Sequence, residues 1–203
     1  MTQPSILLAD DHSIIRNGLK LYIQLNLGHT DITEVSSCNA LMNELVKKKY
    51  THLVLDIILS DGSTLEVIPN IKKVYPGLNI MVFSMQPVEV YGEALKQYGI
   101  TYYLSKTVGE DEIIEMLNQF INNQAPAVKR QPVTKDNPFS ALAPRELEIL
   151  HYVLKGVGTK EIADTLNLKM NTISTLKTRI YEKTNANNIK ELMELATLYS
   201  VNY

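Results

Sequence analysis

The chain has 203 residues, of which 45% are hydrophobic and 21% are charged, a composition typical of a globular protein long enough for two small domains. No stretch is apolar and long enough to span a bilayer, and the N-terminus lacks the pattern of a signal peptide, so we expect a cytoplasmic protein without membrane partners. Cys38 is the only cysteine, which excludes an internal disulfide and a multi-cysteine metal site.

The formal net charge of −2 is unevenly distributed along the chain. Residues 1–122 carry nine basic and fourteen acidic side chains, whereas residues 139–203 carry eight and seven. This asymmetry suggests two tasks for the two halves. The basic excess of the second half is too small to establish a nucleic-acid partner by itself.

Five short apolar runs, each followed by a stretch with helical spacing of its apolar residues, occupy the first 122 residues. The predicted strands are residues 5–9, 32–36, 53–56, 79–83 and 102–105, and the predicted helices are residues 13–25, 40–46, 65–74, 88–98 and 110–122. Successive strand–helix units require right-handed crossovers. We therefore predict an α/β domain with a doubly wound, five-stranded parallel sheet.

Polar residues follow four of these strands, and the carboxyl ends of parallel strands meet at one edge of a sheet. They are Asp10 and Asp11, Asp56, Ser84 and Lys106. Converging carboxylates call for a hard cation such as Mg²⁺, which takes oxygen ligands. The lysine and the hydroxyl suit the oxygens of a phosphoryl group, which makes Asp56 a candidate nucleophile that becomes an acyl phosphate. Singly, each residue also has a plain structural interpretation, as a cap or a strand-end group.

On these five positions, residues 1–122 resemble the receiver domain of two-component response regulators, with a flavodoxin-like fold. The resemblance implies that Asp56 is the phosphoacceptor and that its donor is a sensor histidine kinase or a phosphotransfer protein. It also implies that Asp10, Asp11 and Asp56 hold Mg²⁺ together with the backbone carbonyl of Ile58.

The same resemblance assigns phosphate-contact and switch roles to Ser84, Tyr103 and Lys106. Ser84 is expected to move towards the phosphate and Tyr103 to rotate inward behind it. The chain departs from the family pattern at Ser60 and Thr107, where prolines are usual.

Residues 123–138 hold three prolines and no periodic apolar residues, which predicts a linker. Residues 139–203 then show an all-α pattern of four helices, starting near Pro144, Lys160, Asn171 and Asn188. The second and third are joined by a three-residue turn at Asn167, as in a helix-turn-helix.

The third of these helices has an inward stripe of Ile173, Leu176 and Ile180. Its other face carries hydroxyls and cations that suit base edges and phosphates, although a solvated surface is the plainer interpretation. With the motifs 142–146 (LAPRE), 160–163 (KEIA) and 171–173 (NTI), the segment resembles the LuxR-type DNA-binding domain. Together the two resemblances indicate a NarL/FixJ-type response regulator. The residues that we expect to contact DNA are Asn171, Thr172, Ser174, Thr175, Lys177, Thr178, Arg179 and Lys183.

The resemblance further implies that the active form is a homodimer on double-stranded DNA, with contacts supplied by the last helix. The expected dimer residues are Ile189, Leu192, Leu195, Ala196 and Tyr199, for which a role confined to the core is the open alternative. Lys169 and Leu176 depart from the residues usual in this family, so the target DNA sequence cannot be carried over.

The sequence thus predicts a DNA-binding transcriptional regulator, not an enzyme, switched by phosphorylation of Asp56. One alternative is a phosphorylation-independent DNA-binding regulator that uses the receiver for dimerisation. A weaker alternative is an aspartate-nucleophile phosphatase, but Ile58 stands where such an enzyme needs a second acid.

Overall fold

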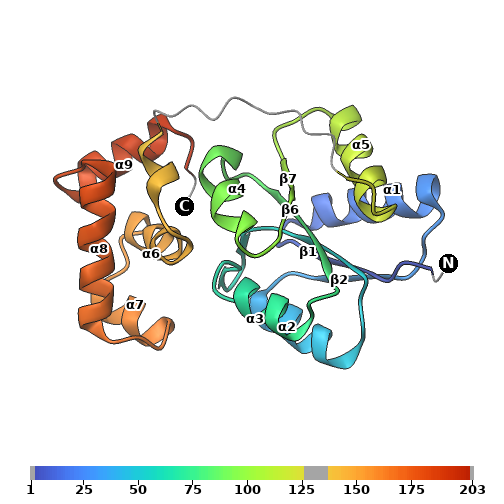
Figure 1. The fold of residues 1–203 in the computed structure, drawn as a ribbon, viewed down its shortest axis with the longest axis horizontal. Helices are drawn as coiled ribbons and strands as arrows, with labels where there is room; N and C mark the ends of the chain where they lie inside the picture. Colours follow the sequence, from blue (N-terminus) through green and yellow to red (C-terminus); the bar gives the residue numbers. More distant parts are fainter. Residues whose placement is uncertain (1–2, 126–136, 202–203) are drawn as a thin grey trace. The chain divides into compact units, whose positions relative to one another are not determined.

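The computed structural model describes residues 3–125 and 137–201 of the chain (Figure 1). By packing, the chain divides into two compact units, with residues 1–85 and 98–129 in one and residues 86–97 and 130–203 in the other, so far as these are described. Most of the predicted linker 123–138 lies outside the described residues. The domain bounds 1–122 and 139–203 remain predictions, because residues 86–97 group with the second unit.

A five-stranded parallel sheet forms the centre of the first unit, as predicted. Its strands are β1 (Ile6–Ala9), β2 (Ile32–Val35), β3 (His52–Leu55), β6 (Asn79–Ser84) and β7 (Tyr102–Ser105). Their order is β2-β1-β3-β6-β7, the flavodoxin-like order in which β3 is central. In register, Leu55 of β3 lies between Ala9 of β1 and Val82 of β6. The residues that follow these three strands therefore emerge at the same edge.

Helices cover both faces of this sheet (Figure 1). The helices of the first unit are α1 (Ser13–Leu27), α2 (Cys38–Lys47), α3 (Ile68–Val74) and α5 (Glu110–Ile121). Leu19 and Ile23 of α1 and Phe120 of α5 pack in one cluster with alternate residues of the strands, while α2 and α3 lie on the opposite face. The sheet is thus the middle of three layers.

The central strand β3 is buried on both faces. Leu53 and Leu55 are 0% exposed and Val54 is 3% exposed, although they point to opposite sides of the sheet. A continuous apolar run is the pattern of a parallel strand that is covered on both sides. The position of the carboxyl end of β3 is consequently fixed by packing on both faces of the sheet.

A short hairpin that the sequence did not predict follows β3. It consists of β4 (Ile58–Leu59) and β5 (Gly62–Ser63), which pair antiparallel. Gly62 has φ 147°, a value that side chains rarely allow. Two-residue strands leave no periodic pattern, so this stretch was expected to be only a turn.

The second unit is helical. Its elements are α4 (Val88–Lys96), the short 3₁₀ helix η1 (Pro138–Ala141), α6 (Pro144–Leu154), α7 (Thr159–Thr165), α8 (Met170–Thr184) and α9 (Ile189–Leu198). The turn between α7 and α8 contains Asn167 with φ 51°, the left-handed conformation that asparagine tolerates. Within this unit, helices α6 to α9 confirm the predicted helix-turn-helix arrangement. None of the described helices combines the length and apolar character needed to cross a membrane.

Candidate functional site

Asp56 lies at the end of β3 with only 5% of its surface exposed. Its Oδ1 accepts a hydrogen bond from the Ser84 hydroxyl at 2.5 Å, and its Oδ2 accepts one from the Lys106 ammonium group. Ser84 ends β6 and Lys106 follows β7, so three neighbouring strands supply these groups. The structure therefore brings together the residues that the sequence placed at this edge.

Lys106 also pairs with a second carboxylate. Its Nζ lies 2.5 Å from Asp10 Oδ2, and its side chain is 2% exposed. Burial raises the pKa of the Asp56 carboxyl above its ordinary value, while Lys106 and Ser84 oppose this rise and Asp10 adds to it. A further cation at this edge would favour the ionised carboxylate.

An acidic cluster adjoins Asp56 on the same edge. One ligand atom from each of Asp10, Asp11, His12 and Asp56 lies within 4.8 Å of the others. Three of these groups are carboxylates, and carboxylate oxygens are the ligands that Mg²⁺ prefers. The donor set therefore fits the magnesium ion that the sequence predicted.

His12 is the member of this cluster that sequence reasoning missed. Its Nδ1 lies 2.8 Å from Asp11 Oδ1 and 3.1 Å from Asp10 Oδ1. The signal available in the sequence was its position directly after the acidic pair.

Other groups that fix the site also escaped the sequence. The Thr64 hydroxyl, 0% exposed, donates to the backbone carbonyls of Asp56 at 2.9 Å and Ile57 at 3.1 Å. Arg16 donates to the carbonyl of Asp10 at 2.5 Å. The Ile58 backbone N–H lies 3.5 Å from Asp56 Oδ1, which places Ile58 directly beside the acceptor. Ile58 was expected at the site from the sequence, whereas no sequence pattern marks the contacts of Thr64 and Arg16.

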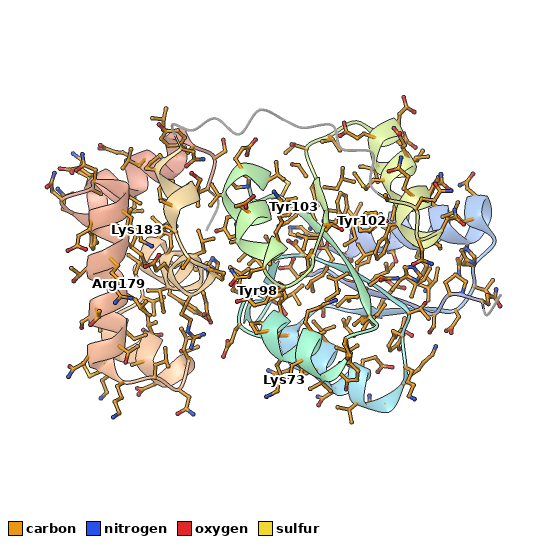
Figure 2. The ribbon with its side chains drawn as sticks, viewed as in Figure 1. Lys73, Tyr98, Tyr102, Tyr103, Arg179 and Lys183 are labelled. Atoms are coloured by element: carbon orange, nitrogen blue, oxygen red, sulfur yellow. The ribbon has the colours of Figure 1, made fainter. Side chains whose placement is uncertain are left out.

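Tyr103 lies on β7 and is half-buried. Tyr102 lies on the opposite side of the strand, where its ring packs against Phe120 with 5.1 Å between centroids (Figure 2). Tyr103 is thus the ring of this pair that lies away from the α5 side of the sheet. Its role as a switch residue stays a prediction.

In the second unit, α8 exposes most of the residues expected at DNA. The exposed ones are Asn171, Thr172, Ser174, Thr175, Thr178, Arg179 and Lys183. Lys177 is half-buried and its ammonium group donates to Thr159 of α7 at 3.3 Å. Arg179 and Lys183 follow each other along one side of α8 (Figure 2). Lys169, one of the departures from the family pattern, precedes the helix and makes no side-chain cap.

Lys183 also has a structural contact. Its Nζ donates at 2.6 Å to Glu146 Oε2, and the same oxygen accepts the Ala143 backbone N–H at 2.8 Å. Glu146 is 3% exposed. Lys183 therefore joins α8 to the start of α6, a structural role that the sequence analysis did not predict for it.

The expected dimer stripe on α9 is divided by burial. Leu192 and Ala196 are 0% exposed within the described residues, whereas Ile189 is 39% exposed. Tyr199 packs against Phe139 with 6.4 Å between ring centroids. Burial favours the core role for Leu192 and Ala196. A dimer contact remains a prediction for the partly exposed members of the stripe, Ile189, Leu195 and Tyr199.

Two parts of the chain match models of known families. Residues 6–118, more than half of the chain, match the model of the response regulator receiver domain. The chain belongs to the response regulators. Residues 140–196 of this response regulator match the luxR family of bacterial regulatory proteins. The two matches confirm the predicted combination of a receiver domain with a LuxR-type domain, which is that of NarL/FixJ-type regulators. This family consists of transcription regulators rather than typical enzymes.

Two known proteins are similar to this chain over nearly its whole length. The response regulator is 28% identical over 215 residues to the oxygen regulatory protein NreC of Staphylococcus carnosus (strain TM300), covering 94% of this chain and 95% of that protein. It is 24% identical over 209 residues to the Fimbriae Z protein of Escherichia coli (strain K12), covering 99% and 100%.

A solved structure shares the fold. RcsB from Salmonella enterica serovar Typhimurium, bound to a promoter in the presence of the phosphomimetic BeF3-, matches this response regulator with a TM-score of 0.83. The sequence identity is 22%, and the match covers 97% of this chain and 100% of that chain.

Proposed function

We propose that this response regulator is a cytoplasmic transcription regulator that binds double-stranded DNA when Asp56 is phosphorylated. A sensor histidine kinase or a phosphotransfer protein would be its donor. The observation that carries the proposal is the geometry at Asp56, a buried carboxylate between a hydroxyl donor at 2.5 Å and an ammonium group. A carboxylate that only capped the end of a strand would not need a hydroxyl and an ammonium group from two other strands as partners.

The chemistry is a phosphoryl transfer between a histidine and Asp56. A carboxylate oxygen of Asp56 attacks the phosphorus of a phosphohistidine, a P–O bond forms, and the P–N bond breaks as the imidazole leaves with the electron pair. The carboxylate thereby loses its charge, and the new phosphoryl oxygens become acceptors. Ser84 and Lys106, which now donate to Asp56, are the nearby donors for those oxygens.

Asp10, Asp11 and Asp56, with the backbone carbonyl of Ile58, would hold the metal ion. Mg²⁺ bound there supplies charge neutralisation for the phosphoryl oxygens. The site residues themselves orient the carboxylate: Thr64 fixes the backbone of Asp56, and Lys106 holds the Asp56 and Asp10 carboxylates together.

Phosphorylation shifts a pre-existing equilibrium between a silent and a DNA-competent state. Movement of Ser84 towards the phosphoryl group and inward rotation of Tyr103 are the local events that bias this equilibrium.

The active form is a homodimer whose partly exposed α9 residues Ile189, Leu195 and Tyr199 contact the second copy. Its two α8 helices read half-sites about 34 Å apart, one turn of DNA.

The RcsB complex supports this proposal, because that relative of the same fold is bound to a promoter in the presence of a phosphomimetic. We expect the same linkage in this chain through its own α8 surface.

The test is DNA affinity with and without a phosphodonor. A duplex selected from a random library would be titrated with the full chain, with acetyl phosphate and Mg²⁺ present or absent, and binding followed by fluorescence anisotropy. We expect phosphorylation to tighten binding about tenfold or more, the range of allosteric coupling, and high salt to weaken it steeply.

The matched variants are Asp56→Ala and Asp111→Ala, the second of which removes an exposed acid of α5. Only Asp56→Ala should abolish the effect of the phosphodonor. Equal affinity of wild type and Asp56→Ala under both conditions would instead favour a regulator that binds DNA independently of phosphate.

A further inference from the structure

The side of α8 that faces away from the core carries one continuous stripe. The buried side of the helix consists of Ile173, Leu176, Ile180 and Thr184. With 3.6 residues per turn, the opposite side is formed by residues spaced four, three and four apart, Asn171, Thr175, Thr178 and Glu182. All four are exposed. Asn171, Thr175 and Thr178 are neutral, so the N-terminal half of this stripe presents no charged side chain to the bases.

The two threonines of the stripe have their hydroxyl protons engaged within the helix. Thr175 Oγ1 donates to the carbonyl of Asn171 at 2.9 Å, and Thr178 Oγ1 donates to the carbonyl of Ser174 at 3.1 Å. A new contact that uses the methyl group breaks neither bond. A new contact that needs the hydroxyl as a donor breaks one.

This asymmetry selects among base pairs. In the major groove guanine presents only acceptors, N7 and O6, which a hydroxyl with an engaged proton does not satisfy; cytosine N4 can donate to that hydroxyl, but cytosine has no C5 methyl group for the threonine methyl to pack against. Thymine presents its C5 methyl group, against which a threonine methyl packs. The amide of Asn171, on the same stripe, has the donor and acceptor that match N6 and N7 of adenine.

The cations of α8 flank the stripe. By the same helical spacing, Arg179 and Lys183 lie together on one side of it (Figure 2), and Lys177 lies on the other. Lys177 is oriented towards α7 by its bond to Thr159. Cations on both flanks of a neutral stripe contact phosphates, which position the helix but carry no sequence information. The stripe ends at Glu182, which carries a negative charge. Base contacts are therefore confined to the N-terminal half of the stripe, because the N-terminal part of a recognition helix contacts base edges.

We propose that this regulator reads A·T pairs in each half-site, through thymine methyl groups packed against Thr175 and Thr178 and adenine bound by Asn171. The inference rests on the proposed DNA-binding function and names the chemistry that its recognition helix selects.

The first experiment uses the wild-type full chain treated with acetyl phosphate and Mg²⁺. Duplexes would be selected from a random library, and each thymine of the enriched half-site replaced singly by deoxyuridine, which removes the methyl group and keeps every hydrogen-bonding atom. We expect enriched half-sites with an A·T core and two thymines whose replacement weakens binding about fourfold each, the effect of losing one buried methyl group.

The second experiment assigns the methyl contacts to residues. Thr175→Ser keeps the hydroxyl and removes the methyl, whereas Thr175→Val keeps a methyl and removes the hydroxyl. We expect Thr175→Ser to bind the thymine and deoxyuridine duplexes equally at one position, and Thr175→Val to bind the thymine duplex within about twofold of wild type. The same pair at Thr178 should reveal the second position.

The outcomes separate two failures. If selection enriches no sequence, the proposed function fails and this inference falls with it. If half-sites are enriched but are centred on G·C pairs, or are indifferent to deoxyuridine, the proposed function stands and the methyl readout is wrong. If Thr175→Val loses affinity while Thr175→Ser binds as the wild type does and still distinguishes thymine from deoxyuridine, the hydroxyl is the reading group and the inference is also overturned.

Discussion

The ammonium group of Lys106 bridges Asp10 and Asp56, two carboxylates with almost no exposure to solvent. Buried charges of one sign repel each other and lose hydration, so this cation offsets a cost that the fold would otherwise bear. The sequence predicted the three residues, because each directly follows an apolar run. It did not predict that the lysine pairs with both acids, since that depends on side-chain positions across three strands.

A second buried titratable group lies in the other unit. His151 of α6 is 4% exposed, and burial, together with the charge of Lys155, lowers its pKa to about 4. The unfolded chain takes up this proton near the ordinary value of about 6.5. Between these values the unfolded state binds more protons, so stability is lost as the pH falls from about 6.5 towards 4.

We therefore expect the second unit of the wild type to lose about 2 kcal/mol of stability between pH 7 and pH 5 through this group, and His151→Leu not to lose it. Hydrogen exchange of the amides of α6–α9, corrected for intrinsic rates, would give the free energy of unfolding at each pH. His29→Gln, in the first unit, is the control. Equal pH dependence in the wild type and His151→Leu would refute the role of burial.

At the scale of elements, α6 and α8 are joined by a charged contact inside a largely apolar interface. Glu146 accepts from the Ala143 backbone and from Lys183, and thus both caps α6 and holds α8. The motif at residues 142–146 suggested the start of a helix, but its partner 37 residues later in the chain leaves no local signal.

Lys183→Met leaves the buried Glu146 carboxylate without its cation, and we expect it to lower the stability of the second unit by about 1–2 kcal/mol. Lys190→Met is the matched control, because the Lys190 side chain is 85% exposed and 3.9 Å from Glu194, and it should change stability by about 0.5 kcal/mol or less. Urea unfolding of both variants, followed by hydrogen exchange in α6 and α8, would measure the difference. Equal stabilities of the two variants would contradict a structural role for the Lys183–Glu146 ion pair.

Amphipathic helices and apolar strands were predicted from the sequence, whereas three elements without either pattern were not. The buried run of β3 and the amphipathic pattern of α8 appear where the sequence placed them. The hairpin β4–β5 and η1 were missed because two-residue strands and a single 3₁₀ turn leave neither a bounded apolar run nor a helical period. The same limit applies to side chains: Ile173 and Ile180 were assigned to the core from spacing, whereas the division of the α9 stripe by burial required the packed structure.

For the whole molecule, the order of strands and helices was enough to predict the parallel sheet and the edge at which Asp56 emerges, whereas the flavodoxin-like fold was implied by the family resemblance. The reason is physical, since right-handed crossovers leave few arrangements for five strand–helix units. The support given by Thr64, Arg16 and His12 could not be predicted, because each contacts the site through an atom that the local sequence does not specify.

The central claim is that one carboxylate receives the phosphoryl group, and intact-protein mass spectrometry with site mapping tests it most directly. The full chain and its Asp56→Asn variant would be incubated with acetyl phosphate and Mg²⁺. We expect the wild type to gain the mass of one phosphoryl group, located on Asp56, and the variant to gain none. An unchanged mass of the wild type, or a phosphoryl group on another residue, would contradict the claim.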